Sequence, residues 1–200
     1  MSEIKNVIFD LGGVVVKWEP MNVLHSFKGD RAIVEYVRKN GFFSGYWRDF
    51  DRGVMSQAEL VRRTAAEIGC PEESCEAFVM HILHSLSPME ETEELIRELS
   101  ARGFKLYCLS NMSVEFYDYL KTREVFRYFD GQIISALERM VKPNREIYEL
   151  LLNRFHLRAE DCLFIDDLQA NVDAAKELGI QAVRFTPCRE MYDLIREKLR

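Results

Sequence analysis

The fold is decided near the start of the chain, by the stretch Val7-Ile8-Phe9-Asp10-Leu11-Gly12-Gly13. A short apolar run of this kind is typical of a strand buried on both faces, as in a parallel sheet. Asp10 follows the run, and the two glycines permit a tight turn and a close approach of the backbone to a ligand. The pattern places Asp10 at the carboxyl end of a strand, although an ordinary turn after a strand has the same composition.

Similar apolar runs recur along the chain and alternate with helical patterns. We predict five strands, over Ile4–Phe9, Phe104–Leu109, Gln132–Ser135, Cys162–Ile165 and Gln181–Phe185. Helical patterns begin at Pro88, Pro143 and Asn171. Proline, present at the first two of these starts, is typical of a first helical turn. This alternation predicts an α/β fold, a doubly wound parallel-sheet and Rossmann-like core that binds ligands at the carboxyl ends of its strands.

Residues 18–87 interrupt the alternation because they contain helical patterns only. These patterns lie near Met21–Phe27, Asp30–Lys39, Ser56–Ile68 and Glu72–His84, and the third begins with the capping box Ser56-Gln57-Ala58-Glu59. We therefore predict a catalytic core formed by residues 1–17 and 88–200, with a small helical domain, residues 18–87, inserted after the first strand. A helical module at that point is expected to cover the carboxyl edge of the sheet as a lid.

The composition is that of a globular protein with an acidic excess. The 200 residues carry a formal net charge of −6 without a basic stripe, which argues against a nucleic-acid partner. Five cysteines without CxxC spacing indicate reduced thiols. The longest apolar run near the start is too short to cross a membrane and lacks the flanks of a signal peptide. We expect a cytoplasmic monomer or homodimer that binds neither nucleic acid nor membranes.

Two polar sites follow predicted strands or precede helices. Ser110 and Asn111 end the second strand, where their hydroxyl and amide donors can hold a phosphoryl oxygen or cap the helix that begins near Val114. Lys142 lies just before the helix that begins at Pro143, which makes it either a cation beside the crevice or a solvent-exposed lysine. Each pattern alone permits both interpretations.

Asp166 and Asp167 end the fourth strand and are the strongest single signal. Two adjacent carboxylates at the end of a buried strand repel one another unless a cation neutralises them. Hard oxygen ligands of this kind suit Mg²⁺, which keeps several waters and shares the phosphates of its substrates. The pair therefore predicts a magnesium site at the edge of the sheet that also carries Asp10.

Taken in order along the chain, these groups resemble the haloacid dehalogenase superfamily over the whole sequence. The motifs are Asp10-Leu11-Gly12-Gly13-Val14, Ser110-Asn111, Lys142-Pro143 and Phe164-Ile165-Asp166-Asp167. The helical insert resembles the cap domain of that superfamily. The chain is most similar to the small-cap subgroup, which includes sugar-phosphate phosphatases such as glucose-1-phosphate phosphatase and the amino-terminal domain of soluble epoxide hydrolase.

The resemblance implies a Mg²⁺-dependent phosphatase that acts on a small phosphomonoester, such as an aldose 1-phosphate. Asp10 would attack phosphorus to form an aspartyl-phosphate, and Lys142 would supply a cation beside it. Ser110 and Asn111 would bind phosphoryl oxygens. The metal would be held by Asp10, the Gly12 carbonyl, Asp167 and, directly or through water, Asp166.

Gly12 departs from the family pattern. Phosphatases of this superfamily usually carry a second Asp at this place, which protonates the leaving group and later activates water. A positioned acid and base is worth about 10²–10⁴-fold in rate. Three alternatives could make up for the missing acid. The substrate could have a good leaving group, a water could act in its place, or the acid could be Asp49 or Asp51, in the loop expected over residues 46–53.

Two other functions are compatible with this departure. A metal-independent 2-haloacid dehalogenase also lacks the second Asp, but it has no use for the uncompensated pair Asp166 and Asp167. A catalytically weak phospho-ligand binding module would keep the fold, but it gains nothing from a nucleophile at the end of a strand.

Overall fold

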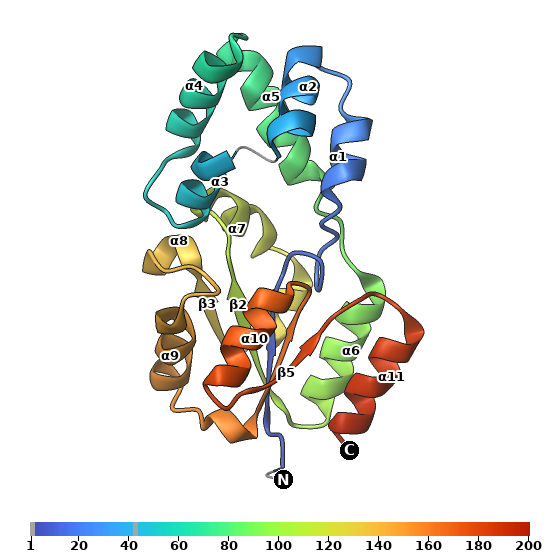
Figure 1. Ribbon diagram of the computed structural model, residues 1–200. Coiled ribbons are helices and arrows are strands. Elements are labelled where there is room, and N and C mark those ends of the chain that lie inside the picture. Colours follow the sequence, from blue (N-terminus) through green and yellow to red (C-terminus); the bar gives the residue numbers. More distant parts are fainter. Residues whose placement is uncertain (1–2, 42–43) are drawn as a thin grey trace.

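A five-stranded parallel sheet lies at the centre of the protein, whose computed structural model describes residues 3–41 and 44–200 (Figure 1). The strand order is β3-β2-β1-β4-β5, with every neighbouring pair parallel. The strands are β1 (Asn6–Phe9), β2 (Lys105–Ser110), β3 (Gly131–Ile134), β4 (Cys162–Asp166) and β5 (Gln181–Arg184). The predicted α/β class is confirmed, and the strands lie close to their predicted bounds.

Helices connect the strands and form the segment between β1 and β2. They are α1 (Pro20–Ser26), α2 (Arg31–Asn40), α3 (Ser44–Asp51), α4 (Gln57–Ile68), α5 (Glu72–Ser85), α6 (Glu90–Ala101), α7 (Val114–Leu120), α8 (Ser135–Glu138), α9 (Arg145–Arg154), α10 (Gln169–Glu177) and α11 (Arg189–Lys198), with short 3-10 turns η1 (Glu124–Tyr128) and η2 (Ala159–Asp161). The capping residue predicted for α4 is confirmed, because Ser56 Oγ accepts from the Glu59 N–H at 3.2 Å. None of the helices in the described part of the chain has the length and apolarity needed to cross a bilayer.

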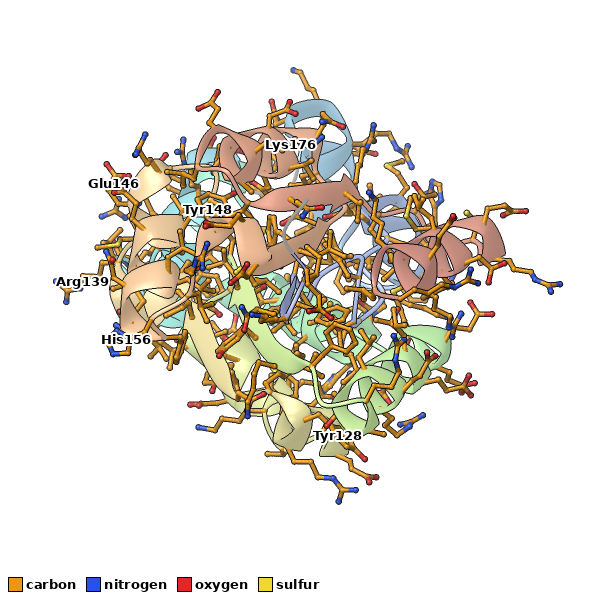
Figure 2. The ribbon with its side chains drawn as sticks, turned by 90° about the horizontal axis from the view of Figure 1, so that it is seen from below. Tyr128, Arg139, Glu146, Tyr148, His156 and Lys176 are labelled. Atoms are coloured by element: carbon orange, nitrogen blue, oxygen red, sulfur yellow. The ribbon has the colours of Figure 1, made fainter. Side chains whose placement is uncertain are left out.

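The sheet is buried on both faces because successive residues of its strands point to opposite sides. On one face Ile8 and Phe164 pack with Tyr148 of α9 and with Ala175 of α10. Figure 2 places Tyr148 between α9 and the sheet, where it meets Phe164 edge to face. On the other face α6 and α11 cover the strands. The helices on both faces hold the strand ends in a fixed order at the carboxyl edge.

Helices α1 to α5 gather above the carboxyl edge of the sheet, and we call them the helical insert, residues 20–85 (Figure 1). The two segments that join it to the sheet run side by side. Val16 forms an antiparallel bridge with Pro88, and the Lys17 N–H donates to the Ser87 carbonyl at 2.8 Å. This pairing fixes where the insert begins and ends relative to β1.

The interpretation of residues 46–53 as a loop is wrong for most of its length, because α3 extends to Asp51. The apolar side chains of α3 pack on α7. Trp47 and Phe50 both meet Phe116 edge to face, with ring centroids 5.7 and 5.9 Å apart. Tertiary packing of this kind stabilises a short helix that its own sequence does not specify.

Gly53, directly after α3, brings the insert against α8 and offers a test of that contact. Its φ of +73° is the left-handed region that favours glycine, and a Cβ there would collide with the Ala136 carbonyl oxygen. Gly69 has a similar φ of +78° with open space around it.

Ala in place of either glycine lowers the free energy of unfolding by roughly 1–2 kcal/mol because of the left-handed backbone, and only Gly53→Ala adds the collision. We expect Gly53→Ala to have the lower melting temperature in thermal unfolding; equal losses would contradict a close contact between α3 and α8.

Candidate active site

Polar side chains from three strands meet at the carboxyl edge of the sheet. Asp10 directly follows β1, where its N–H donates to the Ile165 carbonyl at 2.9 Å and so continues the ladder to β4. Asp166 ends β4 and Ser110 ends β2, the two strands on either side of β1. The strand order therefore brings these sequence-distant residues together, as the parallel fold requires.

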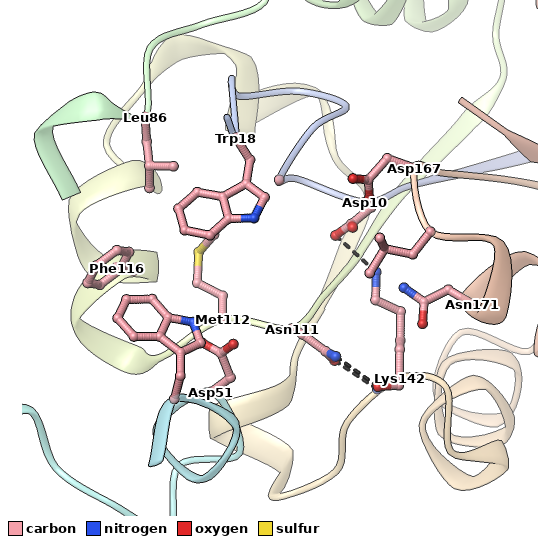
Figure 3. Close-up of a pocket in the computed structure, with 13 residues that line it drawn as sticks. Asp10, Trp18, Asp51, Leu86, Asn111, Met112, Phe116, Lys142, Asp167 and Asn171 are labelled. Carbon is pink, nitrogen blue, oxygen red and sulfur yellow. Dashed lines mark hydrogen bonds and ion pairs between the residues drawn. The ribbon is translucent and has the colours of Figure 1, made fainter. Parts of the chain in front are cut away.

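Lys142 is the cation at the centre of this edge. It is 3% exposed, and its Nζ lies 2.6 Å from Asp166 Oδ2. The same Nζ lies 3.0 Å from Asp10 Oδ1 (Figure 3). Asn111 holds its main chain in place. The Asn111 Nδ2 donates to the Lys142 carbonyl at 2.9 Å, and the Lys142 N–H donates to Asn111 Oδ1 at 2.8 Å. Both polar ends of the Asn111 side chain are thus engaged in positioning Lys142.

Asp166 anchors the rest of the site and is completely buried. Besides the Lys142 ammonium, its carboxylate accepts from the Leu168 N–H at 2.9 Å and from Asn171 Nδ2 at 3.0 Å to both oxygens. Tyr148 supports Asn171 in turn by donating to its carbonyl at 3.0 Å. Since these donors occupy most of its acceptor sites, Asp166 serves chiefly to orient Lys142 and Asn171.

Three carboxylates in this site fit a divalent cation. Asp10, Asp166 and Asp167 each offer an oxygen, and these oxygens all lie within 4.8 Å of one another. Hard oxygen donors of this number suit Mg²⁺. Gly13 makes room for the group, because a Cβ on it would lie 2.8 Å from Asp167 Oδ2, and its φ of +72° also favours glycine.

The charges of the site are unbalanced in the protein alone. Burial raises the pKa of Asp10; Lys142 lowers it, Asp166 and Asp167 raise it again, and the result is a pKa of about 7. Burial followed by the charge of Asp166 also raises the pKa of Asp167. Burial lowers the pKa of Lys142, but the charges of Asp10 and Asp166 outweigh burial and leave that pKa raised. A bound cation would relieve this excess of negative charge.

A cavity of about 260 Å³ opens from Asp10 toward the helical insert (Figure 3). Its far wall is largely apolar and combines side chains from the insert, from the segments that join it to the sheet, from α7 and from the turn between β2 and α7. These are Trp18, Trp47, Leu86, Met112 and Phe116. The insert also contributes one carboxyl group, that of Asp51 at the end of α3. The cavity thus joins a charged floor to an apolar roof, the usual character of a small-molecule site.

The structure brings together most of the residues singled out from the sequence. Asp10, Gly12, Asn111, Lys142 and Asp167 line the cavity, and Asp166 lies directly beneath them. The residues of the apolar wall could not be found from the sequence, because nothing in their local pattern distinguishes them from ordinary core residues. The position of Asp51 was not determined either, since it depends on how α3 packs.

Ser110 and Asn111 lie at the carboxyl end of β2, and only one of the two is among the described residues that line the cavity. Ser110 is 1% exposed and, among the described residues, is not one of those that line the cavity. Asn111 lines it, with its amide bonded to the Lys142 main chain. Ser113, not Ser110 or Asn111, caps α7, because its Oγ accepts from the Phe116 N–H at 3.3 Å.

Comparison with known protein families identifies the class. Residues 4–179 match the family of haloacid dehalogenase-like hydrolases, and the chain belongs to that family. It is therefore an enzyme, a hydrolase whose relatives include proteins named phosphatases.

Two relatives with curated names illustrate the range of the family. The chain is 30% identical over 202 aligned residues to the sesquiterpene phosphatase astK of Aspergillus oryzae, a match that covers 97% of this chain and 98% of the relative. It is 24% identical to the phosphorylated carbohydrates phosphatase of Thermotoga maritima, with 88% of this chain and 82% of the relative covered.

Solved structures share the whole architecture. A predicted HAD-like family hydrolase from Porphyromonas gingivalis superposes with a TM-score of 0.85 at 26% identity, covering 100% of this chain and 99% of that one. A HAD family enzyme from Bacteroides thetaiotaomicron, solved in complex with magnesium and inorganic phosphate, has a TM-score of 0.82 at 22% identity, covering 96% of this chain and 100% of that one. The fold, including the helical insert, is therefore a recurrent one.

Gly13 and Gly103 form a matched pair for testing the metal site, because both have a positive φ, of +72° and +89°. Gly13→Ala places a Cβ against the Asp167 carboxylate, whereas a Cβ on Gly103 meets nothing within 4 Å. We expect Gly13→Ala to require at least about tenfold more Mg²⁺ than the wild type for the same thermal stabilisation. Gly103→Ala should respond like the wild type. Equal Mg²⁺ responses in all three proteins would argue against Asp167 as a ligand.

The raised pKa of Asp10 predicts a pH-dependent cost to the metal-free protein. Because its folded pKa of about 7 exceeds the ordinary value, the folded state holds a proton that the unfolded state has lost, and stability falls as pH rises from about 4 to 7. Asp10→Asn removes this cost. We expect the variant to melt about 2–4 °C above the wild type at pH 8 in chelator, which corresponds to about 1 kcal/mol. The difference should shrink at pH 5; a lower melting temperature at both pH values would contradict the expectation.

Proposed function

We propose that this protein is a Mg²⁺-dependent phosphatase that hydrolyses a small phosphomonoester through an aspartyl-phosphate on Asp10. The observation that carries the proposal is the buried contact of Lys142 with both Asp10 and Asp166, beside a third carboxylate, Asp167. A strand-end carboxylate flanked by a fixed ammonium and a divalent-cation site is arranged to receive a phosphoryl group, whose negative charge a carboxylate alone would repel.

The chain's own residues would divide the work as follows. Asp10 attacks phosphorus, and the Lys142 ammonium neutralises charge that develops on the phosphoryl oxygens. Asn111 and Asn171 hold Lys142 and Asp166 in position. The cation would be held by Asp10, Asp167 and the Gly12 carbonyl, with Asp166 behind them, and it supplies electrostatic stabilisation of the phosphoryl group when bound.

Neither alternative suits these contacts as well. A metal-independent dehalogenase would leave three carboxylates facing a single ammonium, which is an expensive arrangement in a buried site. A binding module would have no use for a carboxylate held at attacking position beneath the ligand. Both alternatives are outcomes of the experiment below.

The size of the cavity favours a small substrate. A volume of about 260 Å³ lies just below the usual range of small-molecule sites, roughly 300 to 1,000 Å³. The indole rings of Trp18 and Trp47 lie nearly parallel, with an interplanar angle of 17°, and aromatic faces of this kind can pack on a sugar ring. An aldose 1-phosphate is therefore one candidate.

The scarcity of available polar groups favours a second candidate, the phosphate ester of a small apolar alcohol. The amides of Asn111 and Asn171 are already paired within the site, so sugar hydroxyls would meet mainly the apolar wall. The relative astK is named as a sesquiterpene phosphatase, which is consistent with an apolar leaving group in this family. In either case we propose that the helical insert acts as a cap that closes over the leaving group and determines which alcohol is accepted.

A phosphate panel tests the proposed function. We expect the protein with Mg²⁺ to hydrolyse p-nitrophenyl phosphate and either glucose 1-phosphate or benzyl phosphate, and to lose this activity in chelator. Asp10→Asn should lower the rate by at least about 10³-fold, because the nucleophile is removed. Phosphate release is measured for each substrate, together with chloride release from chloroacetate.

Three results would contradict the proposal. Unchanged turnover in Asp10→Asn would exclude the nucleophile. Chloride release without metal would favour the dehalogenase. Tight binding of phosphate without hydrolysis of any ester would favour the binding module.

A further inference from the structure

We propose that Asp51, carried by the helical insert, is the acid and base of the reaction, in place of the carboxyl group that the core lacks at Gly12. This inference rests on the proposed phosphatase function and adds a second catalytic residue to it. Asp51 and Asp10 line the same cavity from opposite sides, one from the end of α3 and the other from the end of β1 (Figure 3). A leaving group above the phosphoryl site would lie between them.

The position of Asp51 is determined from several directions. Its carbonyl accepts from Ser135 Oγ, at the junction of β3 and α8. Ser135 Oγ in turn accepts from the Met112 N–H at 2.8 Å, so the contact ties α3 to two segments of the core. The Asp51 carboxyl group receives hydrogen bonds from the Ser113 main chain and the Trp47 side chain. A carboxyl group held by so many contacts is preorganised rather than free to turn into solvent.

The surroundings favour the protonated form of this carboxyl group. Asp51 is only partly exposed, and Trp47 and Phe116 lie beside it in the cavity wall. Burial, followed by the negative charge of Asp10, raises the pKa of Asp51 well above its usual range. A neutral carboxyl group has one O–H to donate, and its remaining lone pairs can accept the bonds from Ser113 and Trp47. It is therefore suited to donate a proton to a leaving group.

The proton balances over the two steps. As the Asp10 carboxylate forms its bond to phosphorus, the bond from phosphorus to the alcohol oxygen breaks, and Asp51 gives its proton to that oxygen. The alcohol leaves, and Asp51 is now a carboxylate. It takes a proton from the water that attacks the aspartyl-phosphate, so phosphate is released, Asp10 is restored and Asp51 is again protonated.

The test compares two substrates of similar shape that differ in their need for an acid. Benzyl phosphate releases a basic alkoxide unless it is protonated, whereas p-nitrophenyl phosphate releases a stable phenolate. In Asp51→Asn with Mg²⁺, we expect the first turnover of benzyl phosphate to slow by about 10²–10⁴-fold and that of p-nitrophenyl phosphate by less than about tenfold. Nitrophenol should appear as a rapid burst of one equivalent per site, followed by a slow phase, because the second step lacks its base.

Asp49→Asn is the matched control, since Asp49 lies in the same helix and, among the described residues, is not one of those that line the cavity. It should leave both rates unchanged. Thermal unfolding verifies that each variant is folded, and Asp51→Ser provides a second removal of the carboxyl group. Equal slowing of both substrates in the first turnover, or an unchanged rate on benzyl phosphate, would overturn the role of Asp51. Failure of the wild type to hydrolyse either ester would instead overturn the proposed function.

Gly12→Asp gives an independent arm of the same experiment. A Cβ at Gly12 makes only ordinary contact with Trp18 at 3.7 Å, so an acid can be introduced there. Combined with Asp51→Asn, it should recover at least about tenfold of the lost benzyl phosphate activity. No recovery in a folded double variant would indicate that Asp51 does more than transfer a proton and would contradict the proposed role.

Discussion

The contact of one buried ammonium with two carboxylates is the constraint on which the site depends. Lys142 lies between Asp10 and Asp166, and removing it would leave two carboxylates without their cation in a region almost without solvent. The amide groups of Asn111 and Asn171 exist in this setting to hold the charges at their distances. The carboxyl edge of the sheet is therefore rigid before any ligand binds, which lowers the reorganisation that a reaction at Asp10 requires.

The same contact leaves the site electrically incomplete. Three carboxylates face one ammonium, so that two negative charges remain without a partner among these four groups. Burial raises the pKa of Asp10, and the neighbouring charges of Asp166 and Asp167 raise it further. A nucleophile that is poorly ionised by itself becomes effective only when a cation joins it, and the site thus couples metal binding to chemistry.

The fold was predictable from the sequence because the strands are continuous apolar runs, and a parallel sheet fixes where their ends meet. Asp10, Asp166 and Asp167 could be found for the same reason, and Lys142 was found from its place before the helix start predicted at Pro143. The role of Asn111 could not, because an amide at the end of a strand has the same sequence signature whether it binds a ligand or a main chain. The sequence offered Asp49 and Asp51 as alternative acids but could not distinguish them, since α3 is stabilised by Phe116 and Ser135, which are far away in the chain.

The contact between Ser135 and Asp51 has a consequence for how alcohols would be discriminated. With its acid on the insert, the enzyme would be complete only while α3 is docked on α8. An ester whose alcohol is too bulky could still place its phosphoryl group beside Lys142, but it would hold α3 away from the floor of the cavity. Such a compound would bind but would not be hydrolysed. Selectivity would then be expressed in the turnover number and not in affinity, and poor substrates would act as inhibitors of good ones.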